Sequence, residues 1–173
     1  MNEGRCPRKE NAMQKISLNK IATYAVAIAI PLAVGLASAL LTRGDMDIYQ
    51  ELTKPPLAPP AWLFPIAWTI LYTLMGVSAG LVYLNREKAP AEARRGLLYY
   101  ALSLAVNFFW SIIFFGMRSF ILAFIWLILL LYLVVKTVLR YAKVERVAAY
   151  LQIPYILWLL FAGYLNLAVY LLN

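Results

Sequence analysis

The sequence contains no histidine and only one cysteine among its 173 residues. Without histidine, a Ser–His or Cys–His catalytic pair cannot form, and a haem iron has no imidazole to ligate it. Zinc sites that combine cysteine and histidine ligands are excluded for the same reason. Cys6 has no partner for an intramolecular disulfide. We therefore predict neither a metal site nor a conventional nucleophilic active site.

Charged residues are also scarce, at 14% of the chain, whereas a soluble domain has roughly a quarter. Hydrophobic residues make up 64%, and the mean hydropathy is +0.72. The long apolar runs contain no Asp or Glu, and their one basic residue, Lys136, lies near the end of a run. Proton pumps and ion-coupled transporters place ionisable groups at mid-depth in the membrane. This composition disfavours that class of protein.

Five apolar runs are long enough to cross a hydrocarbon core of about 30 Å. They cover residues 21–41, 61–84, 96–115, 120–139 and 147–172. The sequence therefore predicts an all-α integral membrane protein, a bundle of five transmembrane helices formed by residues 21–173. Residues 1–20 are polar and basic without periodicity, so we expect a disordered extension or one that lies along the lipid headgroups.

The basic residues indicate an orientation for these helices. If the N-terminus is cytoplasmic, thirteen of the sixteen Lys and Arg residues fall on the cytoplasmic side, and only Arg43, Lys54 and Arg118 fall outside. Lys and Arg accumulate in cytoplasmic loops of membrane proteins. We therefore expect the N-terminus inside and the C-terminus outside. The net charge of +8 is explained by topology, and nucleic-acid binding is not expected.

The first apolar run has a second interpretation. Its basic start, its apolar stretch and Ala37-Ser38-Ala39 also resemble a cleavable signal peptide, although the stretch is longer than the usual apolar region. Cleavage after Ala39 remains the alternative to a retained helix. A retained helix carries a small residue at every fourth position, which permits close helix packing, but plain apolar filler explains the spacing equally well. These residues are Ala25, Ala29, Ala33 and Ala37.

Three of the expected helices carry aromatic and amide side chains at intervals of three or four residues, so each set shares one helix face. Buried indole and amide groups need hydrogen-bond partners in hydrocarbon, so we expect these faces to point into the bundle. Simple packing explains any one face. Together they predict an apolar cavity with few polar groups, suited to a flat conjugated ligand. Its candidate lining residues are Trp68, Tyr72, Asn107, Trp110, Trp158, Ala162 and Asn166.

The connection between the first two helices is rich in proline. Lys54, Pro55, Pro59 and Pro60 belong to a segment that we expect to be stiff and polyproline-like. It is either a spacer between two spans or a semi-rigid lid over the outer mouth of the bundle, and the sequence favours neither.

Three runs of residues resemble the translocator protein (TspO) family, whose members are also called tryptophan-rich sensory proteins. The resemblance covers roughly residues 22 to 173. The runs are Lys54-Pro55…Pro59-Pro60…Phe64…Trp68…Tyr72, then Asn107-x-x-Trp110-Ser111, and finally Pro154-Tyr155-x-x-Trp158-x-x-Phe161-Ala162-x-x-Leu165-Asn166.

The resemblance implies a five-helix bundle, often a homodimer, in a bacterial cell membrane. It implies a receptor-like sensor or handler of porphyrins, with protoporphyrin IX held in an aromatic cavity that the first loop caps. By motif position, Trp68 and Trp158 match two cavity tryptophans of the family, and Asn107, Ala162 and Asn166 match other pocket positions. A metal-free porphyrin needs no axial ligand, which agrees with the lack of histidine, and no cofactor is required.

The chain departs from the family pattern at three positions. Leu57 replaces a usual tryptophan, Ser103 replaces a frequent glutamine, and Tyr170 is not followed by the basic residue of a cholesterol motif. We therefore do not predict cholesterol binding.

Two alternative functions stay open. The protein could be an enzyme that accelerates light-dependent oxidation of porphyrin, with Trp68 and Trp158 as electron or hydrogen donors; the spans offer no general acid or base for it. The protein could also transport porphyrin or other apolar solutes, although five spans do not divide into the equal repeats common in transporters.

Overall fold

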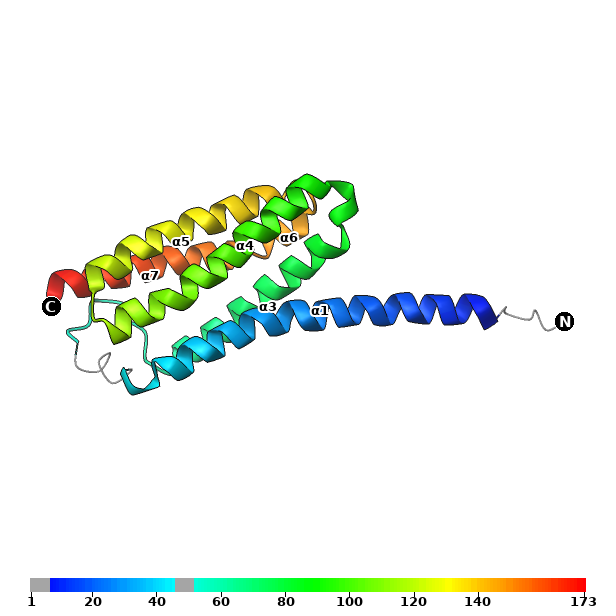
Figure 1. The fold of residues 1–173 in the computed structure, drawn as a ribbon. Coiled ribbons are helices and arrows are strands. Elements are labelled where there is room, and N and C mark those ends of the chain that lie inside the picture. The colour runs from blue at the N-terminus through cyan, green and yellow to red at the C-terminus, as the bar shows by residue number, and fades with distance from the viewer. Residues whose placement is uncertain (1–6, 46–51) are drawn as a thin grey trace.

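The computed structural model describes residues 7–45 and 52–173, and these residues form helices without any strand among them. Five helical segments are long and apolar enough to cross a membrane, which confirms the predicted fold class (Figure 1). The elements are α1 (Pro7–Leu41), η1 (Arg43–Asp45), α3 (Leu63–Leu84), η2 (Arg86–Lys88), α4 (Pro90–Ser111), η3 (Ile112–Gly116), α5 (Phe120–Tyr141), α6 (Arg146–Tyr150) and α7 (Ile153–Leu172).

The first helix begins at Pro7, well before the expected start at Ile21. Residues 7–20, expected to be a disordered extension or one that lies along the headgroups, are helical in the structure, while residues 1–6 lie outside the described part of the chain. The segment is rich in Arg, Lys, Glu, Ala and Gln, which have high helix propensity, and proline suits a first helical position. This end of α1 extends past the rest of the bundle (Figure 1).

The expected fifth span is divided into the short helix α6 and the longer helix α7. Pro154 has no N–H to donate to the carbonyl oxygen of Tyr150, and its ring clashes with that carbonyl, so α6 ends at Tyr150. The helix restarts at Ile153, which places Pro154 in the first turn of α7, where proline costs little. The break also brings Gln152 into the core, where its Nε2 donates to Ser78 Oγ at 3.2 Å.

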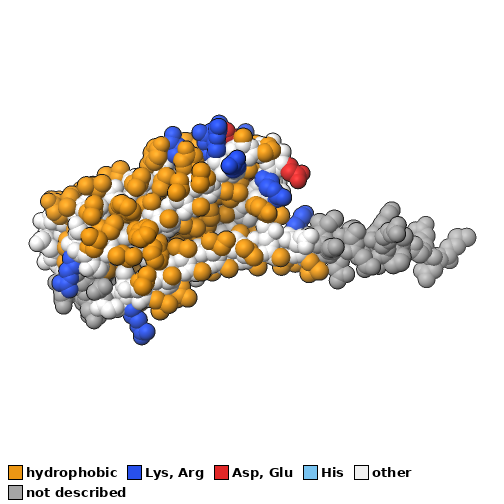
Figure 2. Space-filling model, in the orientation of Figure 1, with side chains coloured by type: hydrophobic (Ala, Val, Ile, Leu, Met, Phe, Trp, Pro, Cys, Tyr) orange, Lys and Arg blue, Asp and Glu red, His pale blue; other side chains and the backbone are white. Residues whose placement is uncertain are grey.

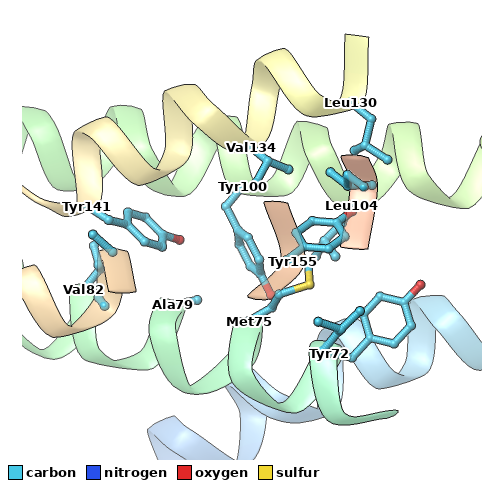
Figure 3. Close-up of a cluster of buried hydrophobic side chains, with 14 of the residues drawn as sticks. Tyr72, Met75, Ala79, Val82, Tyr100, Leu104, Leu130, Val134, Tyr141 and Tyr155 are labelled. Atoms are coloured by element: carbon cyan, nitrogen blue, oxygen red, sulfur yellow. The ribbon is translucent and has the colours of Figure 1, made fainter. Parts of the chain in front are cut away.

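The five long helices close a ring in the order α1, α3, α7, α5, α4. Their inward side chains form one continuous buried cluster, to which α3, α4, α5 and α7 each contribute a tyrosine (Figure 3). Met75 of α3 lies at its centre with no exposed surface. Charged residues are absent from this cluster, so burial of apolar surface and close packing hold the interior together.

α1 and α3 approach each other most closely at two glycines. A Cβ atom on Gly76 would lie 2.5 Å from Ile28 Cα and 2.7 Å from the Ala27 carbonyl oxygen, and one on Gly80 would lie 2.8 Å from the Tyr24 ring. Gly76 and Gly80 thus form a small-xxx-small contact. The alanine stripe of α1 plays no part in it, because its members are exposed: Ala25, Ala29, Ala33 and Ala37.

The outer surface is apolar along the length of the bundle, and the visible Lys and Arg side chains lie at its ends (Figure 2). At the α3–α4 end, the Glu92 carboxylate forms ion pairs with Arg140 Nη1 at 2.8 Å and with Lys143 Nζ at 3.7 Å. Lys88 Nζ lies 3.0 Å from Glu145 Oε2, and this hydrogen bond lowers the pKa of the Glu145 carboxyl. These pairs tie the α3–α4 connection to the α5–α6 connection.

Candidate functional site

An aromatic cluster joins α3 to α7. The Trp68 ring stacks on Tyr72 at 5.2 Å between centroids and meets the Trp158 ring edge-on at 6.2 Å. Trp158 in turn has edge or tilted contacts with Phe64 at 6.1 Å and with Phe161 at 5.9 Å. Residues four apart on α3 and three apart on α7 share a face, so the helical repeat itself brings these rings together.

Tyr72 is the fixed member of this cluster. Its hydroxyl oxygen accepts a hydrogen bond of 2.7 Å from Asn107 Nδ2 of α4, and its ring fills the space that a side chain at Gly35 of α1 would need. Tyr72 and Asn107 are both buried. In contrast, Trp68 and Trp158 keep part of their surface exposed. The cluster therefore combines a rigid polar pair with two indoles that have more freedom to move.

The other candidate residues lie elsewhere. Trp110 stacks on Phe114 at 5.2 Å, and Phe114 contacts Phe120 at 5.2 Å, which forms a second aromatic cluster. Asn166 Nδ2 donates to the Phe120 carbonyl oxygen at 2.9 Å. Ala162 packs against the main core. The structure thus brings Trp68, Tyr72, Asn107 and Trp158 together, and it places Trp110 and Asn166 beside a neighbouring cluster.

Two polar atoms near the second cluster are buried and unsatisfied within the described part of the chain: Trp110 Nε1 and Asn166 Oδ1. A buried donor or acceptor without a partner costs about 1–3 kcal/mol. One is a donor and the other an acceptor, so together they offer hydrogen-bonding capacity to a ligand with both kinds of group. Such capacity is uncommon in an otherwise apolar interior.

The first loop is fastened to the far end of α7. Tyr164 Oη donates to the Pro56 carbonyl oxygen at 2.8 Å, and the Thr53 N–H donates to Asn173 Oδ1 at 3.0 Å. Pro55 and Pro59 are buried, whereas Lys54 and Pro60 are exposed. The loop therefore lies against the mouth of the bundle, which agrees better with a lid than with a loose spacer.

The loop is less regular than the sequence indicates. The Ala58 N–H donates to the Pro55 carbonyl oxygen at 3.2 Å, which closes a turn. Leu57 occupies its third position with φ of 68°, a conformation that favours glycine or asparagine. The expectation of a continuous polyproline-like segment is therefore wrong, because the chain reverses direction at Pro56 and Leu57.

The list of candidate lining residues was too short. Phe64, Tyr155 and Phe161, which stand in the family motifs and at helical spacing from Trp68 and Trp158, also belong to the cluster. Nothing in the local sequence indicates that Tyr164 and Asn173 hold the loop, because their partners lie more than a hundred residues away in the chain.

The arrangement suits binding more than acid–base chemistry. The α3–α7 cluster offers large π surfaces, one buried amide and two buried phenols, those of Tyr72 and Tyr155. An apolar groove of about 530 Å³ lies between α1, α3 and α4, and none of Trp68, Trp110 or Trp158 lines it. The indoles thus pack on one another, and a ligand between them would have to separate the rings.

Known proteins from several organisms are similar in sequence to this chain. The sequence profile of the TspO/MBR family matches residues 27–172. The tryptophan-rich protein TspO of Chlorobaculum tepidum is 39% identical over 158 residues, 90% of this chain and 99% of that protein. The translocator protein of Bos taurus is 36% identical, covering 79% of this chain and 82% of its own length.

A third relative is the tryptophan-rich sensory protein of Cereibacter sphaeroides, which is 33% identical over 87% of this chain and 89% of its own length. The residues that match the family include most of the first membrane span, the other four spans, the first loop and both aromatic clusters. The five-span bundle, its tryptophan-bearing faces and these matches together show that this chain is an integral membrane protein of the TspO/MBR family.

Proposed function

We propose that this protein binds a porphyrin between α3 and α7, under the first loop, and serves as a sensor or handler of tetrapyrroles. The observation that carries the proposal is the partly exposed pair Trp68 and Trp158, at 6.2 Å, backed by the buried Tyr72–Asn107 pair. Indole faces stack on a flat conjugated ring without a charged partner. The relatives' names, which refer to tryptophan and to sensing, support a role for these residues.

The proposed ligand is a metal-free porphyrin such as protoporphyrin IX. The methyl and vinyl groups on its ring edge suit the apolar side chains of the core, and its two anionic propionates belong outside that core. In this proposal the N-terminus is cytoplasmic and the loop-capped end faces outward, in a bacterial cell membrane, as the distribution of basic residues favours.

The test is a titration of the purified protein in detergent with protoporphyrin IX. Saturable quenching of tryptophan fluorescence, together with a shift of the porphyrin absorbance band, is the expected result. The double variant Trp68→Phe, Trp158→Phe should bind at least tenfold more weakly, because it loses both indole faces. The matched control is Trp62→Phe, since Trp62 is exposed and lies just before α3. Linear quenching, or equal affinity in the double variant, would disprove the proposal.

The contact between Trp68 and Trp158 also favours a second candidate function, the light-dependent oxidation of bound porphyrin by dioxygen. Dioxygen is the oxidant in this reaction, and the two indoles 6.2 Å apart would contact an excited ligand between or beside them. Loss of the porphyrin absorbance band under light and air, faster than with an equal amount of free tryptophan, would support it. If the band survives as long as in the Trp68→Phe, Trp158→Phe variant, the protein binds without degrading.

A further inference from the structure

Two adjoining hollows on the lipid-facing side of the bundle form a groove. The apolar part, about 530 Å³, lies between α1, α3 and α4. The second part, about 390 Å³, lies at the α3–α4 connection; it is also largely apolar, but Arg86, Glu87 and Arg94 border it, and it is called the polar part below. Tyr83 and Leu97 line both parts, so the two adjoin.

The dimensions of the groove match one leaflet of a bilayer. Along α4 its lining residues run from Pro90 to Leu104. At a rise of 1.5 Å per residue this is about 21 Å. One leaflet with its headgroup region is roughly 20 Å thick. The groove therefore begins at the depth of the headgroups and ends near the bilayer centre, as an acyl chain does.

The two arginines of the groove do not take part in the ion pairs that link the neighbouring connections. Within the described part of the chain, the salt bridges of this end involve Lys88, Arg95, Arg140 and Lys143, and neither Arg86 nor Arg94. Both arginines are exposed.

Contacts with Tyr83 hold Arg86 at the groove. Arg86 Nη1 donates to the Tyr83 carbonyl oxygen at 2.7 Å, and the guanidinium lies 4.2 Å from the centre of the Tyr83 ring. A guanidinium has five N–H donors, so this contact fixes Arg86 in place and leaves further donors for a ligand.

The charge of the polar part fits a single phosphodiester. Arg86 and Arg94 are cationic and Glu87 is anionic, which leaves one net positive charge. A phosphodiester carries one negative charge, and guanidinium groups bind phosphate oxygens with strong, charge-assisted hydrogen bonds. The carboxylate of Glu87 repels a phosphate oxygen and so disfavours polyanionic headgroups.

We infer that this groove is a binding site for one glycerophospholipid of the leaflet that borders the α3–α4 connection. The phosphodiester binds Arg86 and Arg94, and an acyl chain lies along Val26, Ala101 and Leu104 in the apolar part. Basic pockets between transmembrane helices are a recognised form of lipid site. The site lies nearer the α3–α4 connection than the Trp68–Trp158 cluster and shares no lining residue with it, so it is independent of the proposed porphyrin site.

The test is native mass spectrometry of the full chain in detergent with added phosphatidylglycerol. The wild type should retain one lipid in a saturable manner. Arg86→Gln, Arg94→Gln should weaken binding at least tenfold, whereas Arg43→Gln, Arg118→Gln, with the same change of charge at the other end of the bundle, should stay within twofold. Glu87→Gln should strengthen binding, because it removes the repelling carboxylate.

The apolar part is tested separately. Ala101 is exposed in the groove, so Ala101→Phe should fill it and weaken lipid binding about tenfold without disturbing the core. Ala33→Phe, on an exposed face of α1, is the matched control, and a thermal melt shows that each variant is folded. Unchanged lipid binding in the arginine double variant or in Ala101→Phe would overturn the inference. A lipid-free dimer that Ala101→Phe dissociates would also overturn it, since a second copy would then occupy the groove.

Discussion

α3 has two contact faces, one after the other along the helix, that differ in how closely they approach their neighbours. The glycine face, Gly76 and Gly80, brings the helix against the backbone of α1. The aromatic face, Trp68 and Tyr72, lies one to two turns earlier and meets α7 and α4 through large rings and one hydrogen bond. The glycine face contains no side chain that can rotate away, whereas the indoles can change rotamer. The first face therefore acts as a fixed framework and the second as the part that can admit a ligand.

The largest expected effect is on the glycine face. Gly76→Ala adds a methyl group within 2.7 Å of the Ala27 carbonyl oxygen and of Ile28, so the two backbones have to separate. Overpacking of this kind costs about 1–3 kcal/mol. We expect the free energy of unfolding, measured by titration with a denaturing detergent, to fall by this amount.

Gly163→Ala is the matched control for this prediction. A Cβ at Gly163 would meet only Phe124 Cε2 at 3.9 Å, an ordinary contact. Because alanine favours helix over glycine by up to about 1 kcal/mol, this variant should be as stable as the wild type or more so. If the two variants had the same free energy of unfolding, the glycine face would not be a close backbone contact.

On the aromatic face we expect smaller losses of stability, and the losses from two substitutions should not add. Asn107→Leu removes the donor to Tyr72 Oη, and Tyr72→Phe removes the acceptor of Asn107 Nδ2. Each change should lower the free energy of unfolding by about 1 kcal/mol, as hydrogen bonds between membrane helices do. The double variant should lose little more than either single variant, because the two changes remove one interaction. Fully additive losses would contradict the contact.

The difference between the faces also explains what the sequence could predict. Helical spacing and apolar run lengths predict the five spans and the membership of Trp68 and Trp158 in a shared cluster, since both follow from local periodicity. The α6–α7 break depends on Pro154 and on a buried bond from Gln152 to Ser78, a partner far away in the chain. The separation of Trp110 and Asn166 from Trp68 depends on how the helices are rotated in the ring, which run lengths do not encode.

A further effect concerns the loop that covers the aromatic face. Tyr164→Phe removes the hydrogen bond to the Pro56 carbonyl oxygen and leaves the ring in place. If this bond is worth about 1 kcal/mol, the loop should open roughly fivefold more often. Amide hydrogen exchange at Thr53 and Ala58 should then be faster by a similar factor. Tyr150→Phe, an exposed tyrosine of α6, should leave their exchange unchanged. Equal exchange in both variants would show that Tyr164 does not restrain the loop.

The smallest effect is expected where α3 leads into the α3–α4 connection, because contacts there are exposed to solvent. The hydrogen bond from Lys88 lowers the pKa of the Glu145 carboxyl in the folded protein. A lowered pKa means that the pair stabilises the fold above the unfolded-state pKa of the carboxyl and loses this contribution as pH falls through the folded-state value. The difference in melting temperature between wild type and Lys88→Gln should therefore be small at neutral pH and vanish under acidic conditions. Added salt should reduce it at neutral pH, since surface ion pairs are screened. The loss in Gly76→Ala should respond to neither change, because it arises from steric overlap and not from charge. A Gly76→Ala deficit that varied with salt would therefore weaken the contrast between a rigid glycine face and the rest of α3.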